Sequence, residues 1–348
     1  EDKVCVLELG MTWPLPEKLI ASFMQDLERV LVVEENDPLL ENGVRAIAQK
    51  TGLDVKVEGK GEILTIQGEN STPKLVQALS SFLGEPCEEA VIEPAANLPK
   101  RPPNLCAGCS HRAVFYAARK IFGDDAVYSS DIGCYTLGML PPLKCADFLF
   151  CMGSSISAGS GFAMVAKKPV VGFIGDSTFF HSGMTGLANA LFNEMDIIVV
   201  ILDNGTTAMT GHQPNPGMIQ EQLGDVMRHL DIEAIVRGIG VTQVRKVSSF
   251  NLRSVEKALE EFRDMKGVRV LIAEEPCALY ARRSLGKGAS RVAEVIAQGE
   301  ETRRCVDSFA CPAFCCINGE YSVDKTLCTG CGVCLQVAPK SFKLVKRG

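Results

Sequence analysis

The chain has 348 residues, of which 46% are hydrophobic, and a formal net charge of −6. Because this length exceeds one typical hydrophobic core, we expect two or three domains. The negative charge argues against nucleic acid as a main partner, and no basic patch offers a membrane-binding surface. The longest apolar runs, such as residues 197–202, are far too short to span a bilayer. We therefore expect neither a nucleic-acid nor a membrane partner.

The fifteen cysteines are many for an intracellular protein, and their spacing indicates the compartment. CxxC and CxxCxxC groupings place thiols too close together for a disulfide framework, and they suit metal or iron–sulfur ligation instead. We therefore expect a reducing cytoplasm, in an anaerobic cell. No signal peptide is visible. The chain opens on Glu1 rather than Met, so we expect a fragment or a processed product.

Apolar periodicity and breaker residues divide the chain into five parts. Residues 1–85 form a small α/β domain, with strands expected at 4–9, 30–33, 55–57 and 63–66 and helices at 16–27, 39–50 and 73–83. Residues 86–103 contain five prolines and form a linker. Residues 104–285 form a second α/β domain, and residues 286–303 a charged helical connector. Residues 304–348 hold seven cysteines and are too few to bury a stable core without a cross-link such as a disulfide or a bound metal.

The central part of the second domain, residues 170–217, has the pattern of a βαβ unit. An apolar run ends in Gly175-Asp176-Ser177, a Gly- and Ala-rich helical pattern follows, and a second apolar run ends in Asp203-Asn204-Gly205. Parallel strands deliver such polar residues to one edge of the sheet, where open α/β sheets bind ligands. Oxygens of Asp176 and Asn204 suit Mg²⁺, which bridges to a ligand phosphate. The alternative is an ordinary strand-end Asp that caps a helix.

A small-residue loop, Cys151-Met152-Gly153-Ser154-Ser155, precedes another helical pattern. The backbone N–H groups at that helix N-terminus are expected to meet a phosphate, which makes Gly153 and Ser154 cofactor-binding candidates.

The βαβ unit resembles the signature of thiamine diphosphate enzymes, GDG followed some 25 to 30 residues later by Asn. This resemblance implies that Asp176, the Asn204 side chain and the Thr206 carbonyl hold Mg²⁺ on the diphosphate. It also implies close approach of the backbone at Gly175. Ser177 stands where the pattern usually has a second Gly, which affects only the expected loop shape.

The C-terminal part contains Cys328, Cys331 and Cys334 at CxxCxxC spacing, and Cys311-Pro312 lies upstream. This arrangement resembles bacterial ferredoxins and implies one [4Fe-4S] cluster on Cys311, Cys328, Cys331 and Cys334. A second tail cluster would lack a ligand, because Ala338 stands at the place of the fourth cysteine. A zinc site is the alternative, although Cys₄ zinc sites usually show two CxxC pairs.

A second set of cysteines is dispersed and comprises Cys106, Cys109, Cys134 and Cys277. From the residues alone, buried structural thiols are the better interpretation. However, the motifs LCAGCSH, SDIGCYTLG, CMGSSIS, GDSTFFHSG, DNGTTAMTGHQPNPG and EEPC together resemble the thiamine-bearing alpha subunit of indolepyruvate ferredoxin oxidoreductases. The resemblance covers nearly the whole chain. By analogy with the related pyruvate enzymes, it implies that these four cysteines hold a second, proximal [4Fe-4S] cluster.

The resemblance implies a thiamine diphosphate-binding α/β fold with a parallel sheet. A transketolase C-terminal-like domain precedes this fold, and a ferredoxin-like iron–sulfur domain follows it. The implied reaction is oxidative decarboxylation of 2-oxo acids, such as indolepyruvate, with coenzyme A and with ferredoxin as electron acceptor. An apolar Met209 would suit an aromatic substrate.

The resemblance also implies two partners. One is a pyrimidine-binding domain or chain, which supplies the catalytic Glu that residues 1–85 lack, and the other is a smaller beta subunit. Two alternative functions are a non-oxidative thiamine-dependent decarboxylase and an electron-transfer protein with a vestigial thiamine site.

Overall fold

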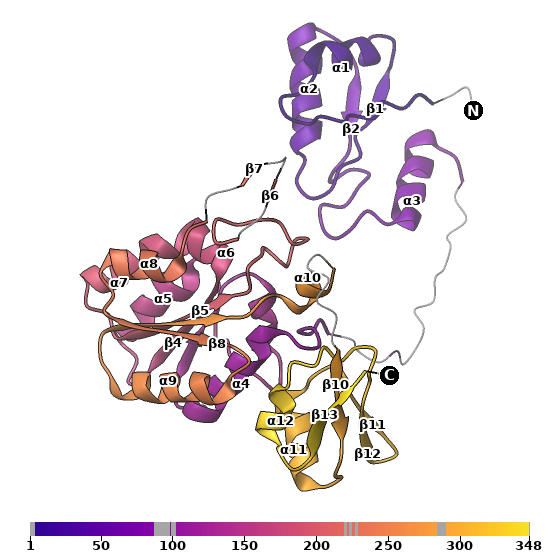
Figure 1. Ribbon diagram of the computed structural model, residues 1–348. Coiled ribbons are helices and arrows are strands. Elements are labelled where there is room, and N and C mark those ends of the chain that lie inside the picture. The colour runs from indigo at the N-terminus through magenta and orange to yellow at the C-terminus, as the bar shows by residue number, and fades with distance from the viewer. Residues whose placement is uncertain are drawn as a thin grey trace. The chain divides into compact units, whose positions relative to one another are not determined.

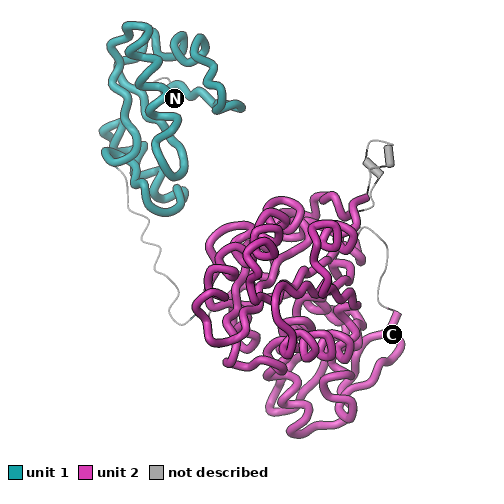
Figure 2. The backbone as a smooth tube through the Cα atoms, turned by 90° about the vertical axis from the view of Figure 1, so that its left-hand side faces the viewer, with its two compact units in different colours: residues 1–100 teal, residues 101–348 magenta. Residues whose placement is uncertain are grey.

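The computed structural model of the protein describes residues 4–86, 98, 102–218, 221–222, 225–226, 229–283 and 290–347. It divides the chain into two compact units, residues 1–100 and 101–348, which Figure 2 shows in different colours. Most of the proline-rich stretch that we predicted as a linker, 86–103, lies outside the described residues.

The first unit is a small α/β structure in which two short parallel strands pack against two helices. Its core consists of Ile20, Met24, Val44 and Ile47, which come from the first two helices, and their neighbours. The elements are α1 (Glu17–Met24), β1 (Arg29–Leu31), α2 (Leu39–Thr51), β2 (Lys56–Glu58) and α3 (Thr72–Leu83).

Two strands predicted in this unit are absent. Residues 4–9 are irregular, and Val4 and Val6 are largely exposed, because no strand among the described residues pairs with them. Residues 63–66 make only an isolated bridge between Leu64 and Lys60. An apolar run becomes a strand only where a partner satisfies its backbone groups. The Glu34 carboxylate accepts the amides of Leu40 and Glu41 at the start of α2.

The second unit, whose elements Figure 1 shows from magenta to yellow, is built on a five-stranded parallel sheet. The order of its strands is β3-β4-β5-β9-β8. The described strands of this sheet are β3 (Val127–Ser129), β4 (Val170–Gly175), β5 (Ile197–Asp203), β8 (Gln243–Ser248) and β9 (Val268–Glu274). The helices of the same region are α4 (Ser110–Phe122), α5 (Ser154–Ala163), α6 (Asp176–Thr178), α7 (Met184–Phe192), α8 (Ile232–Ile239), α9 (Leu252–Asp264) and α10 (Ala278–Arg283). Short 3₁₀ and π turns cover Cys134–Met139 and Phe179–Gly183, and a small hairpin pairs β6 (Glu221–Gln222) with β7 (Asp225–Val226).

Helices cover both faces of this sheet, so its central strands are buried throughout. In β5, Ile198, Val200 and Leu202 pack with α4 and α9 on one face. Ile197, Val199 and Ile201 pack with α7 and α8 on the other face. This doubly covered, parallel arrangement explains why the strands read as continuous apolar runs in the sequence. It confirms the α/β fold class with a parallel sheet.

The C-terminal part packs on the same unit through Ala113 of α4, which joins the core of the tail. Its elements are β10 (Arg291–Val295), α11 (Glu300–Phe309), β11 (Phe314–Ile317), β12 (Glu320–Val323), α12 (Val333–Val337) and β13 (Phe342–Lys346). The prediction of a helical connector over 286–303 is wrong at residues 291–295, which form a strand paired with β13. The partner strand comes from the end of the chain, so a local periodicity does not reveal it.

Within the described residues, no helix is long and apolar enough to cross a membrane.

Candidate active site

Two buried polar side chains stand at the carboxyl ends of the neighbouring strands β4 and β5. The parallel register pairs Gly175 with Leu202, so Asp176 and Asn204 follow their strands at the same sheet edge. Asp176 is 3% exposed and Asn204 is 7% exposed. The βαβ geometry that we inferred from the sequence therefore places the two predicted metal ligands at neighbouring strand ends, away from solvent.

The Asp176 carboxylate lacks a cationic partner among the described residues. Its oxygens accept the Ser177 amide at 2.8 Å and the Asn215 side-chain amide at 3.0 Å. Burial, together with the nearby charge of Asp203, raises the pKa of Asp176 to about 7. A buried carboxylate whose pKa is raised by a second carboxylate lies in an environment that a divalent cation would stabilise. The donor set, carboxylate and amide oxygens, fits Mg²⁺.

Asn204 is held in one orientation by contacts on both sides of its amide. Its Oδ1 accepts the Thr206 backbone amide at 3.1 Å, and its Nδ2 lies 3.2 Å from His111 Nε2. Burial lowers the pKa of His111 to about 4, so the ring is neutral and Nε2 accepts from the amide group. The Cys277 backbone amide donates to the backbone carbonyl of Asn204 at 2.9 Å. Thr206 is itself buried, as its predicted carbonyl role requires.

Gly175 and Gly133 approach the ring of the buried Tyr135, where a Cβ on either glycine would overlap the ring carbons. The Tyr135 hydroxyl lies 2.8 Å from Thr178 Oγ1 and 2.9 Å from the Ile132 carbonyl. The Gly at position 175 is therefore required by packing against Tyr135. The Ser177 hydroxyl accepts from Thr207 at 2.8 Å, which joins the β4 loop to the β5 loop.

The Asp131 carboxylate binds the N-terminus of α5. The amides of Ser154 and Ser155 donate to Asp131 at 3.0 and 3.2 Å, and the Ser155 hydroxyl donates to it at 2.5 Å. The Ser154 amide thus has a protein partner here, and its contact with a phosphate stays a prediction. Gly153, with a φ of 93°, packs against Ser182 where a Cβ would not fit. Burial raises the pKa of Asp131 to about 6.

The four dispersed cysteines, Cys106, Cys109, Cys134 and Cys277, come together in space. Burial, with smaller contributions from the charges of Cys277 and Cys106, raises the pKa of the Cys134 thiol to about 11. Cys109 has a pKa raised to about 12, chiefly by burial, with smaller effects of Cys106 and Cys134. The Cys277 sulfur also lies 3.6 Å from His212 Nε2. Loops after β3 and β9 and the start of α4 thus bring four thiols to one place, next to Asn204.

The four tail cysteines, Cys311, Cys328, Cys331 and Cys334, line one small cavity together with Gly108 and Thr329. The Ala293 amide donates to the Cys328 sulfur at 3.3 Å. Burial raises the pKa of Cys331 to about 11. Among the described residues, no three His, Cys, Asp or Glu side chains are close enough to hold one metal ion.

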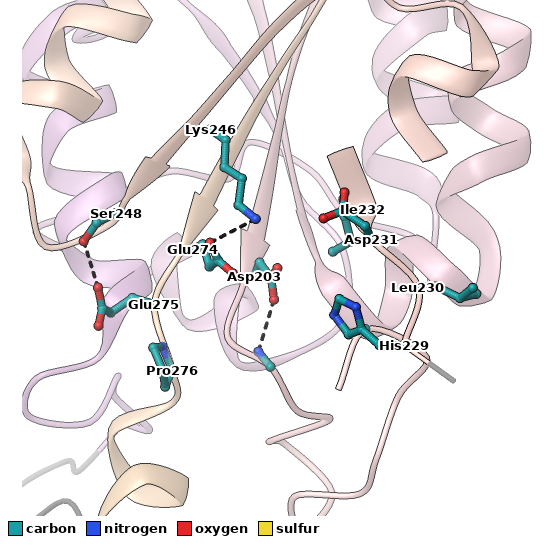
Figure 3. A pocket seen from close by; sticks show the side chains of 12 residues that line it. Asp203, His229, Leu230, Asp231, Ile232, Lys246, Ser248, Glu274, Glu275 and Pro276 are labelled. Carbon is teal, nitrogen blue, oxygen red and sulfur yellow. Dashed lines mark hydrogen bonds and ion pairs between the residues drawn. The ribbon is translucent and has the colours of Figure 1, made fainter. Parts of the chain in front are cut away.

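A cavity of about 340 Å³ opens at the carboxyl ends of β5, β8 and β9, beside Asp203 (Figure 3). Lys246 forms an ion pair with Glu274 at 3.1 Å, and Ser248 donates to Glu275 at 2.8 Å. Asp203 accepts the Gly205 amide at 3.2 Å. The lining of the cavity combines the carboxylates of Asp203, Asp231 and Glu274 with apolar residues such as Leu230 and Ile232.

Residues 131–273 match the family described as thiamine pyrophosphate enzyme, C-terminal TPP binding domain. Six curated proteins named indolepyruvate oxidoreductase subunit IorA align with nearly the whole chain at 35–42% identity. The chain is homologous to indolepyruvate oxidoreductase subunit IorA. This finding confirms the resemblance that we inferred from the motifs.

The IorA of Methanothermobacter thermautotrophicus is 41% identical over 345 residues, which are 96% of this chain and 54% of that protein. The IorA of Pyrococcus abyssi is 36% identical over 375 residues and covers 100% of this chain and 57% of that protein. The chain thus spans about half the length of the curated relatives it matches. A solved 2-oxoglutarate:ferredoxin oxidoreductase from Magnetococcus marinus has a TM-score of 0.46 and 15% identity, over 54% of this chain and 69% of that chain.

Four residues of this IorA-like site escaped the sequence analysis as site residues. They are Asp203, Asn215, His111 and Asp131. Asp203 raises the pKa of Asp176, and Asn215 donates to the Asp176 carboxylate. His111 contacts Asn204, and Asp131 accepts the Ser154 amide. His111 follows the first CxxC directly, and Asp203 precedes Asn204, so adjacency to a motif was the available signal for both. Asp131 and Asn215 carried no such signal beyond lying in polar loops.

Proposed function

We propose that this chain carries the diphosphate-binding and electron-accepting parts of an enzyme that oxidatively decarboxylates 2-oxo acids with coenzyme A and ferredoxin. The observation that carries the proposal is the position of Asn204, a metal-ligand candidate that contacts Cys277 of the proximal cysteine set and also His111, which lies beside that set. His111 lies two residues after Cys109, and Cys277 is itself one of the four thiols. The homology to subunits named indolepyruvate oxidoreductase supports oxidation of a 2-oxo acid.

In the proposed enzyme, Asp176, Asn204 and the Thr206 carbonyl hold Mg²⁺ on the diphosphate of thiamine diphosphate. Bound thiamine diphosphate supplies a carbanion and a ring that stores the electrons of the decarboxylated substrate. This chain orients the metal ligands: His111 fixes the Asn204 amide, and Asn215 fixes the Asp176 carboxylate. Gly175 and Tyr135 hold the backbone of the β4 loop behind them.

Cys106, Cys109, Cys134 and Cys277 would hold a proximal [4Fe-4S] cluster, and Cys311, Cys328, Cys331 and Cys334 a second one in a ferredoxin-like tail. Such clusters accept electrons one at a time, which distinguishes an oxidoreductase from a lyase. The fit rests on two thiol sets of four, both in the same compact unit. Ala338 is fully buried in the tail core, so its position offers no ligand for a further cluster.

The proposed substrates are arylpyruvates such as indolepyruvate. The names of the relatives support this choice, as does Met209, which is 50% exposed in the loop after Asn204 and presents an apolar side chain. A pyrimidine-binding domain or chain would contribute the activating Glu, and a smaller beta subunit would complete the complex. The first unit resembles a transketolase C-terminal-like domain in the proposed arrangement, and the complex works in an anaerobic cytoplasm.

The deciding experiment measures iron and acid-labile sulfide per chain on anaerobically purified protein, together with binding of Mg²⁺–thiamine diphosphate. About eight irons per chain would mean two [4Fe-4S] clusters. Reduction of ferredoxin that depends on indolepyruvate and coenzyme A would complete the support. Thiamine diphosphate binding without iron would instead favour a non-oxidative decarboxylase. Iron without thiamine diphosphate binding would favour an electron-transfer protein.

A further inference from the structure

One buried arginine lies between the two cysteine sets. Arg112, in α4, is 1% exposed and has no carboxylate partner among the described residues. Its Nη2 donates to Asn104 Oδ1 at 2.9 Å and to the Leu105 carbonyl at 2.7 Å. Its Nη1 donates to the carbonyls of Phe309 at 3.0 Å and Ala310 at 2.8 Å. Arg112 therefore binds the backbone immediately before Cys106 and immediately before Cys311, the first cysteine of each set.

The charge of Arg112 acts on both sets as well. Burial lowers the pKa of its guanidinium, and the thiols of Cys311, Cys109, Cys106 and Cys331 oppose that effect. Two of these thiols belong to each set. A guanidinium keeps its positive charge even in such surroundings. Burying a charge without an anionic partner is costly, so a negative group is expected nearby in the complete protein.

The Nε–H group of Arg112 is a second indication that a partner of this side chain is missing. It is buried and has no acceptor among the described residues, although both Nη groups are fully used. An unpaired buried donor is costly, so proteins rarely leave one without a ligand or water. A thiolate or inorganic sulfide of an anionic cluster would supply both the acceptor and the counter-charge.

The loops of the two sets also touch each other. Gly108 lies between Cys106 and Cys109, and Thr329 lies between Cys328 and Cys331. A Cβ on Gly108 would overlap the Thr329 side chain, so the absence of a side chain permits the contact. The Thr329 hydroxyl is buried and unpaired within the described part of the chain. The two CxxC loops are thus packed directly against one another.

We propose that Arg112 is a shared electrostatic positioning residue for two adjacent iron–sulfur clusters, and that it raises the reduction potential of both. This inference rests on the proposed function, because it requires a cluster on each cysteine set. A positive charge and an N–H donor beside a cluster favour its reduced, more negative state. Because one cation serves both sets, its removal shifts both couples in the same direction. Close contact at Gly108 and Thr329 brings the two reduced clusters within magnetic interaction of each other.

The test is an EPR-monitored redox titration of the full, anaerobically purified chain and its variants Arg112→Gln and Arg112→Lys. In Arg112→Gln, we expect both clusters to become harder to reduce by about tenfold or more, which is about 59 mV for a one-electron couple. Arg112→Lys keeps the charge but not the four hydrogen bonds, so its potentials should stay near the wild-type values. If Arg112 only fastened the tail to α4, the Lys variant would resemble the Gln variant.

Arg269→Gln is the matched control. Arg269 is also buried, donates to the carbonyls of Phe262 and Met265, and has an unpaired Nε, but it pairs with Asp196 away from the cysteines. We expect it to lose stability without a change in either potential. Unchanged potentials in an iron-replete Arg112→Gln protein would overturn the inference while leaving the proposed function intact. Iron-free wild-type protein would overturn both.

A second readout tests the adjacency. The spectrum of the fully reduced wild-type protein should be broadened relative to the sum of the Cys277→Ala and Cys331→Ala spectra, because each variant leaves one cluster. A simple sum would contradict the contact between the two clusters, whatever the potentials show.

Discussion

The two cysteine sets each bring four thiols together, one mainly from a short local segment and the other from three separate loops. In the tail, Cys328, Cys331 and Cys334 lie within seven residues, and the loop into α12 positions them with local backbone bonds. The proximal set draws Cys106, Cys109, Cys134 and Cys277 from three loops around the parallel sheet. The tail set depends on local spacing, and the proximal set exists only once the sheet has formed.

This difference decides how much each set depends on other residues. The tail loop follows from its own sequence, with Ala293 as an outside donor to Cys328. The proximal loops need long-range contacts: Asp131 holds the start of α5, and the Cys277 amide is bound to Asn204. The two sets meet at Gly108, Thr329 and Arg112. A local motif is therefore joined to a dispersed one by a few buried contacts.

The largest expected effect separates the sets directly. Cys277→Ala should lose the proximal cluster and keep the tail cluster, whereas Cys331→Ala should do the reverse. Each variant should retain about four irons per chain. Ferredoxin reduction should fall roughly a hundredfold or more in both, because even outer-shell changes at metal sites cost about 10–100-fold.

Cys145→Ala serves as the control for the cysteine variants, since Cys145 is buried in the sheet core and belongs to neither set. It should keep all the iron. If Cys331→Ala also lost the proximal iron, the proximal set would depend on the tail set, and the two would not form independently.

The contact between the sets is the next target. Gly108 has a φ of 69° and faces Thr329, so Gly108→Ala adds both backbone strain and overlap. We expect a loss of about 4 kcal/mol in unfolding free energy, with about 1–3 kcal/mol from each cause. Gly319→Ala has the strain alone, because its φ is 84° and nothing lies near its Cβ. A thermal unfolding series compares the two, and equal losses would refute the contact.

The sequence predicted the parts of the molecule whose cause is local. The βαβ unit of β4 and β5 follows from two apolar runs and the polar residues after each, so the amino-acid pattern alone assigned Asp176 and Asn204 to one sheet edge. The tail cysteines follow from spacing in the same way. Residues 4–9 show the limit of this reasoning, because an apolar run without a partner strand stays irregular.

What the sequence missed are contacts between distant residues. His111 reaches Asn204 across 93 positions, and Asn215 reaches Asp176 across 39. The strand at 291–295 escaped notice because its partner, β13, lies at the other end of the tail. The proximal cysteines needed resemblance to a family, because no rule of spacing links Cys134 to Cys277. Such pairings are set by the fold as a whole, so one sequence contains no local pattern for them.

A smaller effect tests whether the proximal loops depend on the buried Asp131 carboxylate. Asp131 has its pKa raised by burial from 3.8 to about 6, so the folded protein binds this proton more tightly than the unfolded chain. Its contribution to stability is therefore full below pH 3.8 and is lost as the pH rises through about 6. The loss is at most about 3 kcal/mol. Asp131→Asn cannot titrate, so the stability difference between wild type and variant should change by this amount from pH 4 to pH 7. Parallel pH profiles in urea unfolding would show that Asp131 does not titrate as described.

The smallest effect tests whether the β4 loop is held from behind by Tyr135. Tyr135→Phe removes the hydroxyl between Thr178 and the Ile132 carbonyl, which should cost about 1 kcal/mol. Tyr128→Phe removes a comparable buried hydroxyl that lies 2.8 Å from the Gly123 carbonyl, at the far end of β3. Both variants should lose similar stability in thermal unfolding. Only Tyr135→Phe should weaken binding of Mg²⁺–thiamine diphosphate, by a few-fold in calorimetric titration, because only the Tyr135 hydroxyl contacts Thr178, two residues after Asp176. Equal affinities in the two variants would mean that the loop keeps its shape through Gly175 and Ser177 alone, and that the strand-end site depends on local structure as the tail cysteines do.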